Sequence, residues 1–102
     1  MATLRIEGEV EADVAALFAE QLAQMTREDA PVTLDLSEAD VEDAKTCATL
    51  VEAIRSTAKR VGGLQVLAPP QVIAHTLYRI GALQEGGVIH VVEPRQELGS
   101  SS

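Results

Sequence analysis

Hydrophobic and polar residues alternate with a period of two at the start of the chain. In residues 3–10, Leu4, Ile6 and Val10 alternate with charged residues, which is the pattern of a strand with one buried face. Three further runs rich in Val, Leu and Ile also predict strands, at residues 31–36, 64–68 and 88–92. The run at 64–68 is almost wholly apolar, which is typical of a strand covered on both faces.

The segments between these strands repeat their apolar residues at the spacing of a helix, over residues 14–25, 44–61 and 70–80. Asp43 stands at the expected start of the second helix, where a short acid caps free N–H groups, and Asp13 is expected as a cap or first-turn acid of the first helix. Gly62 follows the second helix as a C-terminal glycine. Lys59 and Arg60 occupy that helix's last turn, where its dipole favours cations.

The order strand, helix, strand, helix, strand, helix, strand predicts right-handed βαβ crossovers. The expected fold is therefore α/β, with a four-stranded, mostly parallel sheet. Three main helices are too few to cover both faces evenly, so we expect them chiefly on one face. Residues 1–93 are expected to form one domain, and residues 94–102 a polar, mobile C-terminal tail.

The charge of the chain excludes several partners. Sixteen acids against eight Lys and Arg give a formal net charge of −8, which opposes binding to nucleic acid or to an anionic membrane surface. With one Phe, one Tyr and no Trp, stacking surfaces for single-stranded nucleic acid are almost absent and the core must be aliphatic. We expect a protein partner, with the chain itself a monomer or a weak homodimer.

The first residues, the longest apolar runs and the cysteine content bear on the cellular location of the protein. Acids interrupt the first 25 residues, and no apolar run approaches the ~20 residues of a membrane span, so direct membrane insertion is not expected. Cys47 is the single cysteine, so no intrachain disulfide can form, and its place on an apolar stripe predicts a buried small hydrophobe. The expected location is cytoplasmic.

The residue types needed for catalysis do not gather in the sequence. His75 and His90 stand alone, and there is no phosphate-binding glycine loop and no nucleophile elbow. The acids at 38–43 lack the spacing of a calcium loop. We therefore expect no enzymatic activity, no metal and no cofactor. The rival from this class is a small-ligand-binding α/β domain, with Asp35 and Ser37 among its few polar groups.

Taken in order, four stretches resemble the STAS domain, the family of anti-sigma factor antagonists and sulfate-transporter cytoplasmic domains. They are EGEV (7–10), VTLDLS (32–37), GGLQVLAPP (62–70) and IGAL (80–83). The resemblance implies the α/β fold described above and a role in protein binding. It covers about nine-tenths of the chain, and its specificity comes from the order and distances of stretches that are individually weak.

The resemblance also places a regulatory position in this sequence. In phosphorylatable STAS domains an Asp-Ser-x-Gly-like stretch opens a helix, and a partner kinase that is also an anti-sigma factor phosphorylates the Ser. Here Asp43 matches the Asp, Ala44 stands at the phosphoacceptor and Thr46 stands at the Gly. The resemblance therefore implies that the phosphoserine switch is absent at Ala44.

The stretch around this position has two interpretations. In the local one, Asp43 is only a helix cap. In the functional one, acids and a short Ala44 side chain leave the helix start open to a basic partner. The predicted partner-binding residues are Ser37, Glu38, Asp40, Asp43, Ala44, Lys45 and Thr46. Thr46 is also the nearest displaced phosphoacceptor, although a Thr at this helical position more often bonds to the backbone or to solvent.

Three uses are compatible with such an interaction module. It can act as an anti-sigma factor antagonist that binds a histidine-kinase-like ATPase, or as a subunit of a chemotaxis-type or kinase signalling complex. It can also be the STAS accessory subunit of a lipid-transport ABC system, bound to the ABC ATPase. The alanine at position 44 weakens the first and the third of these uses, because both usually keep a hydroxyl there.

Overall fold

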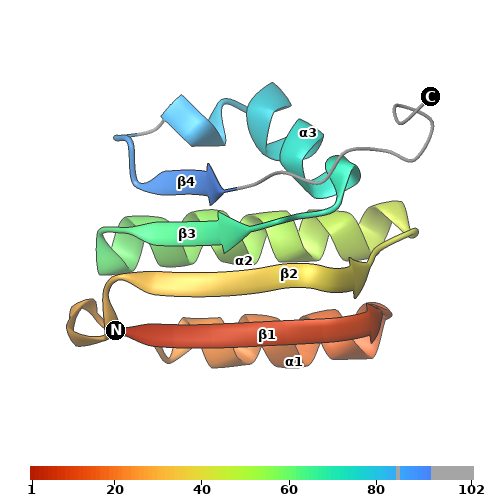
Figure 1. Ribbon diagram of the computed structural model, residues 1–102, viewed down its shortest axis with the longest axis horizontal. Helices are drawn as coiled ribbons and strands as arrows, with labels where there is room; N and C mark the ends of the chain where they lie inside the picture. Colours follow the sequence, from red (N-terminus) through yellow and green to blue (C-terminus); the bar gives the residue numbers. More distant parts are fainter. Residues whose placement is uncertain (85, 93–102) are drawn as a thin grey trace.

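The computed structural model describes residues 1–84 and 86–92, which form one four-stranded sheet with helices beside it (Figure 1). All neighbouring strands are parallel, in the order β1-β2-β3-β4. The predicted α/β fold is confirmed. The tail predicted at residues 94–102 lies outside the described residues. The elements are β1 (Ala2–Glu9), α1 (Ala12–Ala23), η1 (Arg27–Asp29), β2 (Val32–Asp40), α2 (Ala44–Val61), β3 (Leu64–Leu67), α3 (Gln71–Arg79), η2 (Ala82–Gln84) and β4 (Ile89–Val92).

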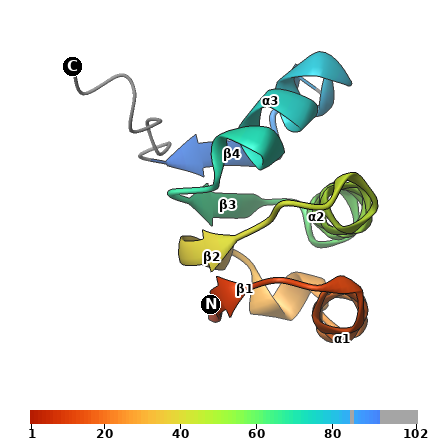
Figure 2. The same ribbon diagram turned by 90° about the vertical axis from the view of Figure 1, so that its right-hand side faces the viewer.

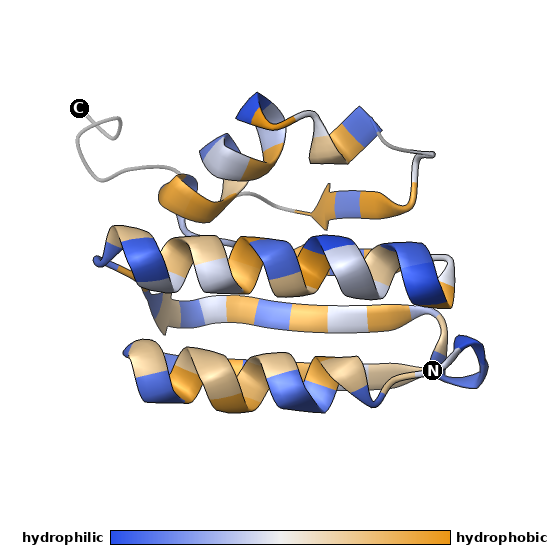
Figure 3. Cartoon of the chain, turned by 180° about the vertical axis from the view of Figure 1, so that it is seen from behind, coloured by the Kyte–Doolittle hydropathy of each residue, from blue (hydrophilic) through white to orange (hydrophobic). Residues whose placement is uncertain are grey.

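The helices lie on one side of the sheet, as predicted (Figure 2). The other face of the sheet, here called the open face, is covered by no helix of the described residues. Along β2 hydrophobic and polar residues alternate (Figure 3), so that Val32, Leu34 and Leu36 are buried beneath the helices. The core is aliphatic apart from Phe18. Its largest fully buried apolar side chains are Leu22, Leu34, Leu36, Leu50, Ile54, Leu64, Ile73 and Leu77.

β2 is longer than the sequence pattern predicts. The expected loop from Ser37 is strand as far as Asp40, because β1 continues to pair beside it. The register shifts by one residue, from Arg5 opposite Asp35 to Glu7 opposite Glu38, so β2 contains a bulge there. Backbone pairing with a neighbouring strand keeps this polar stretch extended.

β3 differs from the prediction in its surroundings. Its apolar composition predicts cover on both faces, but Gln65 is exposed and Leu67 is only partly buried. Leu64 and Val66 face the helices and are buried. A sheet with helices on one side therefore needs only alternate residues of β3 to be apolar.

The first helix begins earlier than predicted and exposes part of its expected apolar stripe. Glu11 is the N-cap of α1, and Asp13 lies in the first turn, which is one of its two expected positions. Leu17 is 62% exposed and Val14 is 37% exposed. The helix instead buries Ala15 together with Phe18 and Leu22, because a methyl side chain lets α1 pack closely on the sheet.

Arg60 links the two large helices. The sequence places Arg60 in the last turn of α2. Its guanidinium nevertheless reaches the end of α1, whose last turn contains no basic residue. Nη2 donates to the carbonyl oxygen of Leu22 at 2.6 Å, and Nε donates to that of Met25 at 3.3 Å. These bonds place a cation at carbonyl groups at and just beyond the end of α1, where the helix dipole favours positive charge.

Replacing Arg60 with Ala is expected to lower the free energy of unfolding by about 1–2 kcal/mol, because two charge-assisted hydrogen bonds to helix-end carbonyls are lost. Urea unfolding measures this change. Arg27→Ala, which removes the same charge from an exposed position, serves as the control and should cost less than about 0.5 kcal/mol. Equal losses in the two variants would contradict the capping role of Arg60.

Candidate functional site

Asp43 begins α2 in the way that the sequence predicts. It is the N-cap residue in extended conformation, and its Oδ2 accepts hydrogen bonds from the backbone N–H and the Oγ1 hydroxyl of Thr46, both at 3.0 Å. The predicted helix start at residues 43–45 and the predicted cap are therefore confirmed. At its other end α2 stops at Gly62, whose φ of 82° is the left-handed conformation that favours glycine.

Thr46 is more deeply buried than is usual for a contact residue. Its side chain is only 2% exposed, and its hydroxyl bonds to Asp43. Thr46 also contributes to the lining of a groove beside the helix start. The Thr46 hydroxyl completes the cap, and the place of Thr46 in a partner contact or as a displaced phosphoacceptor stays a prediction.

The next residues around the helix start divide into two sets. Ala44 and Lys45 are exposed, so the outer side of the first turn of α2 carries one methyl group and one ammonium group. Cys47 is buried, as predicted, with its Sγ at 3.7 Å from the carbonyl oxygen of Val72 on α3. The helix start is therefore anchored on its inner side and accessible on its outer side.

A groove of about 370 Å³ lies between the starts of α1 and α2. Four carboxylate side chains contribute to its lining, those of Glu9, Glu11, Glu42 and Asp43. They meet because parallel strands end at the same edge of a sheet. β1 and β2 end side by side, with Glu9 opposite Asp40, and the N–H of Val10 donates to the carbonyl oxygen of Asp40 at 2.8 Å.

Sequence reasoning missed Glu9 and Glu11 as part of this acidic region. They lie more than 30 positions before Glu42, and only the pairing of β1 with β2 brings them to the same place. The available signal was the acid-rich stretch directly after the first predicted strand, combined with the expected parallel sheet. Together these place two acidic strand ends at one edge.

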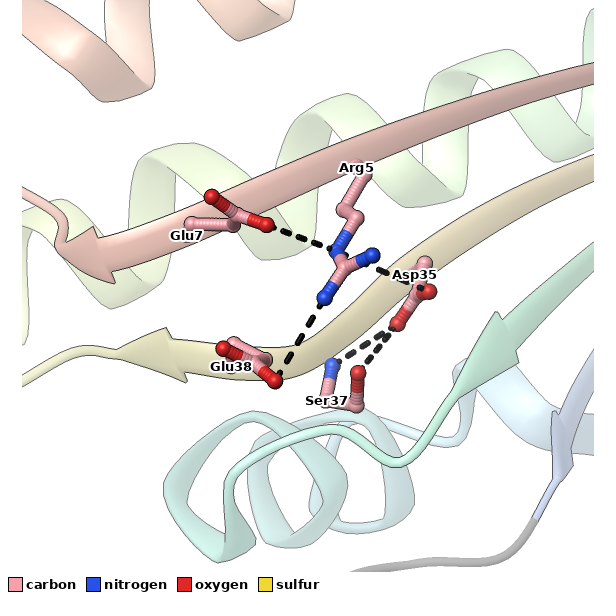
Figure 4. Close-up of polar contacts among 5 residues, drawn as sticks. All are labelled: Arg5, Glu7, Asp35, Ser37 and Glu38. Atoms are coloured by element: carbon pink, nitrogen blue, oxygen red, sulfur yellow. Dashed lines mark hydrogen bonds and ion pairs between the residues drawn. The ribbon is translucent and has the colours of Figure 1, made fainter.

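Ser37 and Glu38 belong to a different cluster, centred on Arg5 (Figure 4). The guanidinium contacts Glu7 at 3.1 Å and Glu38 at 3.4 Å, and it lies 4.0 Å from Asp35. Arg5 is on β1, and the cluster lies on the open face rather than at the start of α2. The structure therefore separates two of the seven predicted contact residues from the helix start.

Asp35 carries the perturbed carboxyl group of this cluster. Its Oδ1 accepts the Ser37 hydroxyl at 2.6 Å and the Ser37 N–H at 3.0 Å. The hydroxyl bond is the largest cause that lowers the pKa of Asp35 below its ordinary 3.8, followed by the backbone bond, and the Arg5 charge adds to the shift. Asp35 thus stays a carboxylate at lower pH than an ordinary aspartate does.

Ser37→Ala is expected to raise the pKa of Asp35 toward its ordinary 3.8, because it removes the strongest donor to the carboxylate. Carboxyl carbon shifts followed by NMR from pH 6 to pH 2 would measure this. Since folding lowers the pKa, the stabilising contribution of Asp35 is present above 3.8 and is lost as the pH falls through the folded-state value. An identical titration in the two proteins would contradict this assignment.

The geometry first defines a class of protein. The chain is a small α/β domain with an acidic strand edge and an exposed helix start. In the part of the chain that the structure describes, no helix is both long enough and apolar enough to cross a membrane. A family model described as "Mlab, STAS domain" matches residues 1–92, and the chain therefore belongs to the STAS domain family. No curated protein matches the chain.

Family membership indicates a kind of function. STAS domains are in general non-enzymatic binding modules that mediate protein–protein interactions. A site in this chain is therefore better sought among exposed surfaces that fit a protein than among catalytic groups. Two exposed regions stand out by their charge, the acidic groove at the helix starts and the Arg5 cluster on the open face.

Proposed function

We propose that the protein is a non-enzymatic interaction module that binds a basic protein partner at the start of α2. The proposed contact, here called the docking surface, consists of Glu9, Glu11, Asp40, Glu42, Asp43, Ala44 and Lys45. Thr46 supports it from beneath through the cap. Ser37 and Glu38 are left out, because Ser37 bonds to Asp35 and Glu38 pairs with Arg5 on the open face.

One observation carries the proposal, the exposed Ala44 beside a groove lined by four carboxylates. The methyl group lets another chain approach the helix end closely, whereas a longer side chain would hold it away. The carboxylates attract Lys or Arg of a partner, raise the rate of association and orient the complex. They also oppose the docking of acidic proteins, which gives selectivity.

The docking surface lacks the hydroxyl of the family's phosphoserine switch. The resemblance aligns Ala44 with the phosphoacceptor, and the hydroxyl of Thr46 is buried against Asp43. A phosphate at the family's position would add about −1.5 to −2 charges and so change the affinity of this surface for its partner. Without it, we propose that the surface stays in one state and that control rests with the partner.

The proposed partner is an anti-sigma factor of the histidine-kinase-like ATPase type, or a component of a kinase signalling complex. Both proposals come from the resemblance and share the requirement for a basic contact surface. Purified protein immobilised through its C-terminus can capture such a partner from a lysate of the source cell. The captured protein is then identified, purified and used in direct binding measurements.

Charge reversal tests the docking surface with that partner. Glu42→Lys should weaken binding by about tenfold or more, and raising the salt concentration should reduce the difference from wild type. Glu20→Lys makes the same charge change on the exposed side of α1, outside the docking surface, and serves as the control. Equal effects of the two variants would contradict the proposed location, leaving only a nonspecific effect of net charge.

A further inference from the structure

The outer edge of β1 lacks a neighbouring strand within the described residues. The N–H of Ala2 donates to the carbonyl oxygen of Pro31, and that of Val10 donates to Asp40, so even-numbered residues direct their backbone groups toward β2. Backbone direction alternates along a strand, and Thr3, Arg5 and Glu7 therefore direct their N–H and C=O groups outward. Such a row of backbone groups is a template for another strand.

A groove of about 250 Å³ runs between this edge and α1, which lies beside β1 on the helix side of the sheet (Figure 2). Leu17 and Val14 of α1 contribute to its lining, although they are 62% and 37% exposed. Ile6 and Phe18 reach it from the core side. Gln21 of α1 and Arg5 and Glu7 of β1 complete the lining. Side chains of an added strand that point toward α1 would therefore meet the apolar surface of Leu17 and Val14 beside these polar groups.

The side chains of β1 on the opposite, open face present a different environment. Arg5 is there surrounded by the carboxylates of Glu7, Asp35 and Glu38 (Figure 4). One guanidinium against three carboxylates leaves an excess of two negative charges. Side chains of an added strand that point to this face would therefore meet an anionic surface, which favours Lys or Arg.

We propose that the outer edge of β1 binds an extended segment of a partner protein as a fifth, antiparallel strand, and that the segment alternates apolar and basic residues. Its apolar side chains enter the groove over Leu17 and Val14, and its basic side chains lie beside Glu7 and Glu38. Main-chain hydrogen bonds to Thr3, Arg5 and Glu7 supply affinity, while the alternation supplies specificity. A second copy fits less well, because it would bring its own Glu7 and Glu38 carboxylates to the same anionic surface.

The probe is a capped peptide of about nine residues that alternates valine and lysine. Amide hydrogen exchange measured by NMR reports the pairing residue by residue. On binding, the amides of Thr3, Arg5 and Glu7 should exchange at least about tenfold more slowly. The exchange of the Leu4 and Ile6 amides should change little, because they already face β2. A peptide alternating valine and glutamate should bind at least about tenfold more weakly.

A matched pair of variants tests the groove. Leu17→Lys should weaken binding of the valine–lysine peptide by about tenfold, whereas Ala16→Lys, one residue away and outside the groove lining, should have little effect. Circular dichroism confirms that both variants fold.

Three results would overturn the proposal. The first is the absence of binding, and the second is binding that protects none of the three outward amides. The third is protection of these amides in concentrated protein without peptide, which would identify a second copy as the occupant. The docking surface at α2 takes no part in these measurements, so its failure and the failure of this proposal are distinguishable.

Discussion

Replacing Ala44 with Arg is expected to abolish binding to the captured partner while the domain stays folded. The exposed methyl group stands at the start of α2, beside the groove lined by Glu42 and Asp43. A guanidinium there blocks the approach to the helix end and faces the basic residues of the partner, and close like charges cost several kcal/mol. We expect affinity to fall about a hundredfold or more, as measured by titration calorimetry.

The fold should tolerate the change, because Ala44 is exposed and Arg is nearly as good a helix former as Ala. A cation near a helix N-terminus costs less than about 1 kcal/mol, and the neighbouring acids offset part of that. Ser56→Arg places the same side chain at an exposed position about three turns along α2 and serves as the control. Undiminished affinity of Ala44→Arg would place the interface elsewhere and leave this stretch as a helix cap only.

The features that could be predicted from the sequence depend on neighbouring residues. The start of α2 is one of them, because an acid cap, an apolar stripe at helical spacing and a closing glycine lie within residues 43–62. The alternation of strands and helices likewise predicted the parallel sheet. Each signal is local, and each agrees with the others, which is the condition under which sequence patterns are reliable.

The features that escaped prediction depend on residues distant in the sequence. β2 continues through its polar end because β1 pairs with it. The residue types of Ser37 and Glu38 do not predict this pairing. The acidic groove likewise joins the ends of two strands. The exposure of Leu17 follows from Ala15, which packs against the sheet in its place and sets the rotation of α1. Helical periodicity identified the helix but not this rotation.

The burial of Thr46 is another nonlocal effect, and it bears on the site. From the sequence, a Thr in the first turn of a helix is a surface residue with a local hydrogen bond. In the structure it is covered, so its hydroxyl depends on Asp43 for a partner. Asp43 therefore accepts hydrogen bonds from two donors, the N–H and the hydroxyl of Thr46, where an ordinary cap residue accepts one.

For this reason Asp43→Ala is expected to destabilise the fold by more than a typical cap substitution. Loss of the cap costs about 0.5–2 kcal/mol, and a buried hydroxyl without a partner adds about 1–3 kcal/mol. We expect a total of about 2–3 kcal/mol, which lowers the melting temperature of a domain this size by roughly 10–20 °C. Thermal and urea unfolding measure both quantities.

Two further variants separate the causes. Thr46→Val combined with Asp43→Ala removes the stranded hydroxyl, and it should recover about 1 kcal/mol relative to Asp43→Ala alone. Asp43→Asn keeps an acceptor oxygen for the cap but removes the charge, so stability should fall by less than about 1 kcal/mol while affinity for a basic partner declines. If Asp43→Ala melts like the wild type, the hydrogen bonds to Thr46 do not hold the helix start. If Asp43→Asn binds the partner as tightly as the wild type, the negative charge of Asp43 belongs to the cap and not to the docking surface.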